Sequence, residues 1–168
     1  MRSFRGGIHP SCAKESTETK PIRKMAPPEK AIILLQQHIG APCEPLVAVG
    51  DEVKVGQKIG DSKGYVSAPV HSSISGKVAS IGPMIDSRGG KTGAITIESD
   101  GKDELWGEST PYGGDLSSLS ADKIRSLIRE AGIVGKGGAA FPTHVKLSPS
   151  KDKIIDAVIL NGCECEPY

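Results

Sequence analysis

The fold class of this chain is decided first by Leu46-Val-Ala-Val-Gly-Asp-Glu-Val-Lys-Val-Gly-Gln-Lys-Ile-Gly60. Apolar residues recur in this stretch at short spacing, and Gly50, Gly56 and Gly60 punctuate it. Val49-Gly-Asp51 predicts a tight turn, because glycine tolerates the positive φ that a turn between strands often needs. Short strands separated by turns about every 8–12 residues are typical of a β-sandwich or barrel.

The same pattern extends to both sides of that stretch. Ala31-Ile-Ile-Leu-Leu35 predicts a short buried strand, and residues 65–70 and 74–81 continue the sequence of short strands. Ala94-Ile-Thr-Ile-Glu98 alternates apolar and polar residues, which favours one more strand. We therefore expect residues 30–104 to form one all-β domain.

Two segments flank this domain. Residues 1–29 are polar, show no apolar period and end near Pro27-Pro28, so we expect an arm that lies extended along another domain or is partly disordered. Residues 105–119 are rich in glycine, proline and serine, and we place a linker and domain boundary there. The remaining segment, 120–168, forms a second unit.

Composition excludes several classes of function. The chain has 168 residues, enough for one or two small domains, and its net charge of +1 gives no electrostatic case for nucleic-acid binding. No apolar run approaches the roughly 20 residues that span a bilayer. Met1-Arg-Ser-Phe-Arg-Gly-Gly7 lacks the apolar core of a secretory signal. We expect a cytoplasmic protein whose association with a membrane runs through partners.

A helix is well signalled after Leu119. Ser120 is a good N-cap, Asp122 complements the helix dipole, and Leu119 with Ile124 fits a hydrophobic staple. Gly132 predicts the end of the helix. One apolar stripe follows from the spacing i, i+3, i+4, i+7; its members are Ile124, Leu127, Ile128 and Ala131.

A glycine-rich loop, Gly132-Ile-Val-Gly-Lys-Gly-Gly-Ala-Ala-Phe-Pro-Thr143, follows this helix. A ligand can approach such a backbone closely, and a helix starting at Pro142 would present unpaired N–H groups to an anion, usually phosphate. Gly135, Gly137 and Ala140 match G-x-G-x-x-G/A, but they follow a helix where the dinucleotide fold has a strand. A flexible connection between helices is the alternative.

The chain beyond the loop resembles the start of an α/β domain. We expect a short helix from Pro142 through Lys146 and a buried, parallel-type strand from Lys153 through Leu160. Ligands in α/β sheets bind at the carboxyl ends of strands. Three polar residues follow the expected strand, and a polar strand exit is the alternative interpretation; they are Asn161, Glu164 and Glu166.

The cysteines and one lysine bear on other chemistries. Cys12, Cys43, Cys163 and Cys165 form neither a C-x-x-C pair nor a ferredoxin-type run, so we expect ordinary reduced thiols and no metal site in this chain. The turn signals at 49–57, Ala68-Pro69 and Gly76-Lys-Val78 resemble the barrel-sandwich layout of biotinyl and lipoyl carrier domains. The lysine nearest a hairpin tip, Lys63, lacks that family's flanking residues, so we expect the scaffold without the swinging arm.

Two longer stretches resemble one family. Ile133-Val-Gly-Lys-Gly-Gly-Ala-Ala-Phe-Pro-Thr-His-Val-Lys-Leu147 and Leu160-Asn-Gly-Cys-Glu-Cys-Glu-Pro-Tyr168 resemble RnfC, the C component of the Rnf electron-transport (ion-translocating oxidoreductase) complex, as do Gly6-Gly-Ile-His-Pro10 and Val66-Ser-Ala-Pro-Val-His71. The second stretch and the loop are also distantly similar to the NADH-binding flavoprotein subunit of respiratory complex I. Lys136 departs from complex I, where an arginine occurs.

The resemblance implies a fold and a chemistry. The fold would be α+β and multidomain, with an all-β barrel-sandwich hybrid domain followed by the start of an α/β domain that binds FMN and NADH. In that family NADH passes a hydride to FMN, and electrons continue to iron–sulfur clusters. The resemblance assigns no catalytic residue and implies these cofactor-binding residues: Gly135, Lys136, Gly137, Gly138, Phe141, Lys146, Asn161, Glu164 and Glu166.

The resemblance also implies that this chain is the N-terminal part of a longer subunit, whose 4Fe-4S clusters lie in the missing C-terminal part. Expected partners are the other subunits of a membrane electron-transport complex, with ferredoxin or a quinone-type acceptor reached indirectly. The expected location is the cytoplasmic side of the inner (plasma) membrane. Two alternatives stay open: a non-catalytic assembly or docking module built on the barrel-sandwich domain, and a carrier modified at Lys63.

Overall fold

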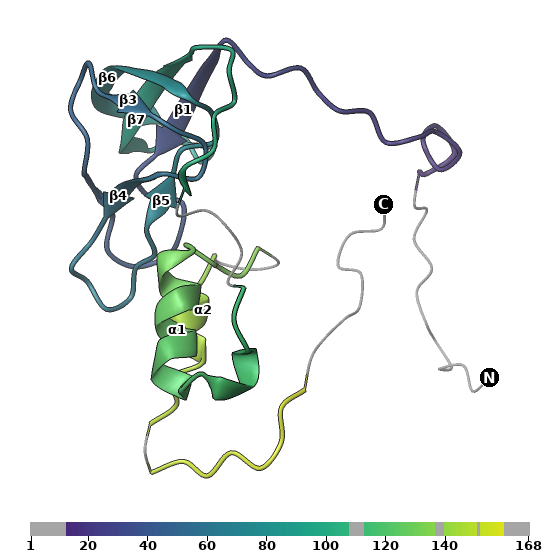
Figure 1. Ribbon diagram of the computed structural model, residues 1–168, viewed down its shortest axis with the longest axis vertical. Helices are drawn as coiled ribbons and strands as arrows, with labels where there is room; N and C mark the ends of the chain where they lie inside the picture. The colour runs from purple at the N-terminus through teal and green to yellow at the C-terminus, as the bar shows by residue number, and fades with distance from the viewer. Residues whose placement is uncertain (1–12, 108–112, 137–139, 151, 160–168) are drawn as a thin grey trace. The chain divides into compact units, whose positions relative to one another are not determined.

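The computed structural model in Figure 1 describes residues 13–107, 113–136, 140–150 and 152–159. The chain divides into two compact units, residues 1–25 with 154–168 and residues 26–153. In the first unit, the described residues form one turn in which the Lys14 carbonyl accepts from the backbone N–H of Thr17 and Glu18, at 2.9 and 2.8 Å. All described helices and strands belong to the second unit.

Two antiparallel sheets make up the first part of this second unit (Figure 1). Their strands are β1 (Lys30–Leu34), β2 (Glu44–Pro45), β3 (Glu52–Val53), β4 (Lys58–Asp61), β5 (Val70–His71), β6 (Gly76–Ile85) and β7 (Lys91–Ser99). One sheet has the order β1-β7-β6-β3 and the other the order β2-β4-β5. The expected strand at residues 31–35 is therefore present as β1, whereas only the end of the 65–70 segment becomes a strand.

Both sheets contribute to one apolar core. Ile95 and Ile97 of β7 and Ile59 of β4 are fully buried, and Val78 of β6 is 1% exposed. In the β6–β7 pair Ile81 stands opposite Ile95, and a bulge between Val78 and Ser80 shifts the register. The expected all-β domain is confirmed, because apolar side chains from two short-stranded sheets enclose a common interior.

The turn predicted at residues 49–51 is present. Gly50 has a φ of +98°, a conformation that other residues rarely adopt. The N–H of Asp51 donates to the Ala48 carbonyl at 3.1 Å, and the Asp51 carboxylate accepts from the Ala48 N–H at 2.8 Å. The turn is thus closed from both sides of the chain.

The helical part contains a 3-10 turn η2 (Leu116–Ser118) and two helices, α1 (Ala121–Glu130) and α2 (Thr143–Lys146). The predicted N-cap of α1 is confirmed, since the Ser120 hydroxyl accepts from the N–H of Lys123 at 3.2 Å. Gly132, with a φ of +68°, follows the last turn as expected. Pro142 was expected inside α2, but it occupies the N-cap position, with an extended backbone.

The apolar stripe expected on α1 is less buried than its spacing suggests. Leu127 and Ile128 are half-buried, Ile124 is 39% exposed, and α1 contains no fully buried residue. Charged side chains provide much of the contact between this helix and the barrel, so its apolar face covers only part of what the period predicted.

The strand predicted from Lys153 through Leu160 is wrong for the part that the structure describes. Residues 153–159 have no strand conformation, and Ile154, Val158 and Ile159 are 94%, 81% and 91% exposed. A strand needs the backbone of a neighbour to pair with, and none of the described strands pairs with this segment. β-branched composition alone therefore does not make it a strand.

Residues next to the expected linker lie against the barrel. Leu105 forms a parallel bridge with Val55, and the Trp106 N–H donates to the Val55 carbonyl at 2.9 Å. Among the residues that the structure describes, no helix combines the length and the apolar character that crossing a membrane requires.

Candidate functional site

The glycine-rich loop closes on itself like a hairpin. Val134 bridges Pro142, the Gly135 N–H donates to the Phe141 carbonyl at 3.0 Å, and the Thr143 N–H donates to the Ile133 carbonyl at 3.0 Å. The loop thus leaves α1 and returns directly to α2. Two of the expected cofactor residues, Gly137 and Gly138, lie outside the described residues of this loop.

The backbone at Gly135 is bare without the fold requiring it. Its φ is not positive, and a Cβ added there would lie 3.7 Å from the Lys146 Nζ and 3.8 Å from the Phe141 carbonyl oxygen, both ordinary contacts. An alanine would therefore fit the protein itself. A glycine at such a position leaves room for another molecule to approach the backbone.

Two cations and one aromatic ring stand beside this backbone. Lys136 and Lys146 are exposed, and neither forms an ion pair with a described residue. Phe141 is half-buried. Ala140, just before it, has a φ of +51°, which is strained for a residue with a Cβ. Backbone strain of this kind is concentrated at ligand sites in proteins.

The loop begins in direct contact with the barrel. A Cβ on Gly132 would lie 2.6 Å from the Pro69 carbonyl oxygen and 3.1 Å from the His71 Cε1, so only glycine allows this approach. Next to the contact lies a cavity of about 320 Å³. Its barrel side includes Gln37, His38 and His71, and its loop side includes Val134 and Lys136.

His38 is the most buried polar group of this cavity, with 7% exposure. Its Nε2 accepts the backbone N–H of Ala68 at 3.1 Å and lies 2.9 Å from the Ser67 hydroxyl oxygen. Burial lowers the pKa of His38, and burial also lowers the pKa of His71. Both rings are therefore neutral at pH 7, and the hydrogen of His38 resides on Nδ1.

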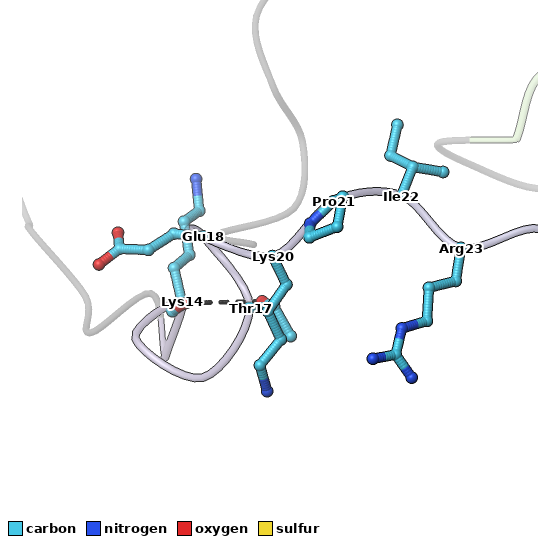
Figure 2. A pocket seen from close by; sticks show the side chains of 7 residues that line it. All are labelled: Lys14, Thr17, Glu18, Lys20, Pro21, Ile22 and Arg23. Atoms are coloured by element: carbon cyan, nitrogen blue, oxygen red, sulfur yellow. Dashed lines mark hydrogen bonds between the residues drawn. The ribbon is translucent and has the colours of Figure 1, made fainter.

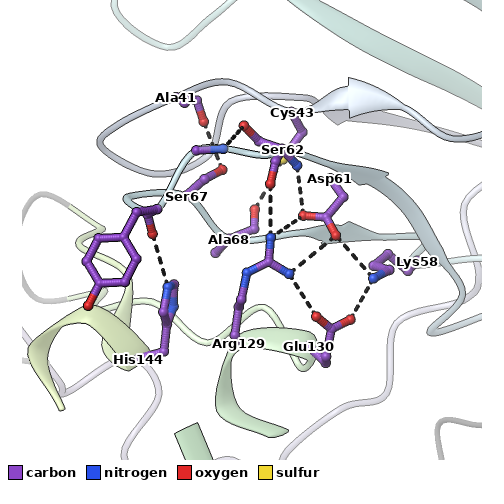
Figure 3. A network of polar contacts seen from close by, with 12 residues as sticks. Ala41, Cys43, Lys58, Asp61, Ser62, Ser67, Ala68, Arg129, Glu130 and His144 are labelled. Atoms are coloured by element: carbon purple, nitrogen blue, oxygen red, sulfur yellow. Dashed lines mark hydrogen bonds and ion pairs between the residues drawn. The ribbon is translucent and has the colours of Figure 1, made fainter. Parts of the chain in front are cut away.

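Charged side chains fasten α1 to β4 (Figure 3). The Arg129 guanidinium donates to the Asp61 carboxylate at 2.8 Å and to the Ser62 carbonyl at 3.0 Å. The Lys58 ammonium bridges Asp61 at 3.1 Å and Glu130 at 2.6 Å. Burial alone would raise the pKa of Asp61, but the hydrogen bonds from Arg129, the Ser62 N–H and Lys58 outweigh it and hold this pKa below its ordinary value.

His144 fastens α2 to the barrel. Its Nε2 donates to the Tyr65 carbonyl at 3.2 Å, and its ring meets the Tyr65 ring edge to face with centroids 6.0 Å apart (Figure 3). His144 is 6% exposed. Its role was not expected from the sequence, although it stands in the Rnf-like stretch directly after Phe141-Pro-Thr143.

The structure brings four of the expected cofactor residues together on one loop and its exit: Gly135, Lys136, Phe141 and Lys146. The other five lie outside the described residues: Gly137, Gly138, Asn161, Glu164 and Glu166. Gln37, His38 and His71 were missed, because nothing in the sequence around them indicates that the barrel approaches the loop.

Other candidate features lie elsewhere. Cys43 is a buried free thiol whose Sγ lies 3.2 Å from the Ala68 carbonyl, and burial raises its pKa; Cys12, Cys163 and Cys165 lie outside the described residues. Within the described ranges, no group of three or more histidine, cysteine, aspartate or glutamate residues could hold a metal ion. Lys63 is exposed between β4 and β5.

An open hollow in the first unit is shown in Figure 2. Three cations, Lys14, Lys20 and Arg23, surround a single turn there, together with the fully exposed Ile22. The hollow contains none of the residues expected to bind a cofactor.

A family model described as the RnfC barrel sandwich hybrid domain matches residues 2–102. The chain belongs to the RnfC family. A second model, described as the Nuo51 FMN-binding domain, matches residues 128–168, which include the glycine-rich loop. The expected order of an RnfC-type barrel-sandwich domain followed by the start of an FMN-binding domain is therefore confirmed.

Curated relatives agree with this family, and each is the C component of its complex. The chain is 52% identical over its whole length to that of the proton-translocating ferredoxin:NAD(+) oxidoreductase complex of Clostridium ljungdahlii, of which it covers 36%. It is 49% identical over 99% of its length to the Na(+)-translocating counterpart of Acetobacterium woodii, covering 37% of that protein. It is 40% identical over 99% of its length to the C component of the ion-translocating oxidoreductase complex of Rhodobacter capsulatus, covering 32%. This RnfC-family chain thus spans about a third of the length of these relatives.

Proposed function

We propose that this chain is the N-terminal part of the electron-entry subunit of a membrane-bound, ion-translocating oxidoreductase. The subunit oxidises NADH through FMN and passes electrons to iron–sulfur clusters that lie beyond this chain. The observation that carries the proposal is the bare backbone at Gly135, between Lys136 and Lys146, in a segment that matches an FMN-binding domain model.

The residues of the loop fit a flavin nucleotide. Gly135 offers backbone that the fold leaves uncovered, Lys136 and Lys146 offer positive charge that no described residue neutralises, and Phe141 offers an aromatic face. FMN, when bound, accepts a hydride from NADH and releases electrons singly. The protein's part is to hold and orient the two nucleotides. We assign the same role to Gly137, Gly138, Asn161, Glu164 and Glu166.

The proposed partners follow from the names of the relatives, which are subunits of ion-translocating complexes. We propose that this subunit binds other subunits of such a complex at the cytoplasmic face of the membrane. Ferredoxin or a quinone-type acceptor would receive the electrons indirectly.

A non-catalytic docking module is the second candidate. Exposed apolar side chains on the barrel favour it, namely Leu46, Val49 and Ile85 at 56%, 61% and 63% exposure. In this interpretation the glycine-rich loop only connects α1 with α2.

The Gly135→Ala substitution in the full-length subunit separates the two candidates. The added Cβ fits the protein, so folding should be unchanged. We expect NADH oxidation with ferricyanide to fall about tenfold or more and FMN content to fall with it, because a displacement of about 1 Å can cost about 100-fold in rate. Gly137 and Glu166 variants should behave alike.

The matched control is Gly113→Ala, at a position in the linker where an added Cβ meets nothing within 4 Å. Its NADH oxidation and FMN content should equal those of the unsubstituted subunit. If Gly135→Ala also leaves both quantities unchanged, the docking module is the better description.

A further inference from the structure

The cavity between barrel and loop has the chemistry of an anion-bearing ligand site. Its volume of about 320 Å³ lies at the lower end of small-molecule pockets, which suits a mononucleotide better than a whole dinucleotide. Among the described residues that line it, Lys136 is the one charged side chain, and none is a carboxylate. A phosphate there would meet attraction from Lys136 and no facing negative charge from these residues.

Two polar groups of the barrel are placed to recognise a flat heterocycle. Because the Nε2 of His38 accepts the Ala68 N–H, its remaining donor is Nδ1, which makes no hydrogen bond to any described residue although His38 is only 7% exposed. The Gln37 amide donates to the Leu34 carbonyl at 3.1 Å, which leaves its Oε1 as an acceptor. A purine offers both complements, a ring nitrogen and an exocyclic amine.

Apolar groups form the rest of the wall. Val70 of β5 lies on one side, and Ile133 and Val134 of the loop lie on the other. Aliphatic walls of this kind accommodate a planar ring, while polar groups at the edge fix its orientation.

The loop presents a second, separate group of residues. Gly135, Phe141 and Lys146 contact one another but do not line the cavity, whereas Val134 and Lys136 do. A flavin nucleotide at Gly135 and a second nucleotide in the cavity therefore do not compete for the same residues.

We propose that this cavity binds the adenylate half of NADH, with His38 and Gln37 of the barrel contacting the adenine and Lys136 of the loop contacting its phosphate. The inference rests on the proposed function, because it takes NADH as the substrate of the same loop. The barrel is then part of the substrate site and gives the enzyme selectivity for the dinucleotide.

The test uses the full-length, FMN-loaded subunit and AMP as the probe. Ala131 lines the cavity, is exposed, and has right-handed helical backbone at the end of α1, so Ala131→Leu fills the cavity without displacing a buried group. Ala121→Leu is the matched control, since it makes the same change at the exposed first residue of the same helix. Gln37→Ala is a second variant, at an exposed barrel position.

We expect Ala131→Leu to raise the Kd of AMP, measured by calorimetry, and the KM of NADH about tenfold or more, with FMN content and kcat unchanged. Gln37→Ala should raise the Kd of AMP in the same direction, and Ala121→Leu should match the unsubstituted subunit. These results together support the adenylate site, since FMN is held elsewhere on the loop.

Other results overturn it. If the unsubstituted subunit oxidises NADH but AMP binds Ala131→Leu and the unsubstituted form equally, the cavity is not the adenylate site, while the proposed function stands. If Ala131→Leu loses FMN and keeps its affinity for AMP, the cavity belongs to the flavin. A subunit that holds no FMN and oxidises no NADH contradicts both proposals.

Discussion

Gly132 is the single residue at which the loop meets the barrel. Its φ of +68° is unfavourable for any residue with a Cβ, and that Cβ would also lie 2.6 Å from the Pro69 carbonyl oxygen. A carbonyl held in the entry to β5 cannot move away as the end of a long side chain could. The position therefore carries two separate penalties against substitution.

Gly132→Ala should destabilise the 26–153 unit by about 2–3 kcal/mol in urea denaturation, through left-handed backbone and overlap with Pro69. Gly101→Ala is the matched control, because Gly101 has a similar φ of +72° but open space around it. It should cost only about 1 kcal/mol. Equal losses in the two variants would mean that the loop does not contact the barrel.

Charge holds α1 in place more than apolar burial does. Hydrogen bonding to Lys58 is the main cause that lowers the pKa of Glu130, and Arg129 adds to it. The pKa of Asp61 is lowered as well, although its burial acts in the opposite direction. Both carboxylates are partly exposed, so each contributes modestly and the network acts as a unit.

The network predicts a pH dependence. Carboxylates whose pKa is lower in the folded state stabilise it above their unfolded pKa of about 4, and this contribution is lost as pH falls through the folded pKa. Asp61→Asn should therefore cost about 1 kcal/mol at pH 7, followed by circular dichroism of the helix signal in urea, and the difference should shrink below about pH 4.

The control for this prediction is Asp103→Asn, because Asp103 is exposed and forms no ion pair with a described residue. Its stability difference should be near zero from pH 7 down to about pH 3. A constant penalty for Asp61→Asn across that range would show that shape, and not charge, fastens α1 to β4.

Across the molecule, buried apolar area is concentrated in the barrel. Ile97 is fully buried between the sheets, whereas Ile154 is 94% exposed in a segment that pairs with no described strand. The two isoleucines are equally apolar, so their difference in burial comes entirely from where the chain places them.

Ile97→Ala should lower the free energy of unfolding by about 2–5 kcal/mol, because it removes buried methyl groups and leaves a cavity. Ile154→Ala in the same 168-residue chain should change it by less than about 0.5 kcal/mol. Guanidinium denaturation followed by Trp106 fluorescence measures both. A large loss at Ile154 would restore the buried strand that its composition suggested.

Local features of this protein followed from sequence alone. The turn at Gly50 and the cap at Ser120 were predicted correctly, because each depends on hydrogen bonds between residues three apart. The loop residues Gly135, Lys136, Phe141 and Lys146 were found for a similar reason, since they lie within one short motif. The resemblance of the motif supplied the family.

Only the tertiary structure decided which distant residues join that loop. His38, Asp61 and Pro69 meet the 129–136 segment although they are far from it in the chain, and no pattern in the sequence encodes that contact. The tertiary structure also decided that residues 153–159 are not a strand. Periodicity describes a residue's preference, but burial and strand pairing require a second segment, and the fold alone determines where that segment lies.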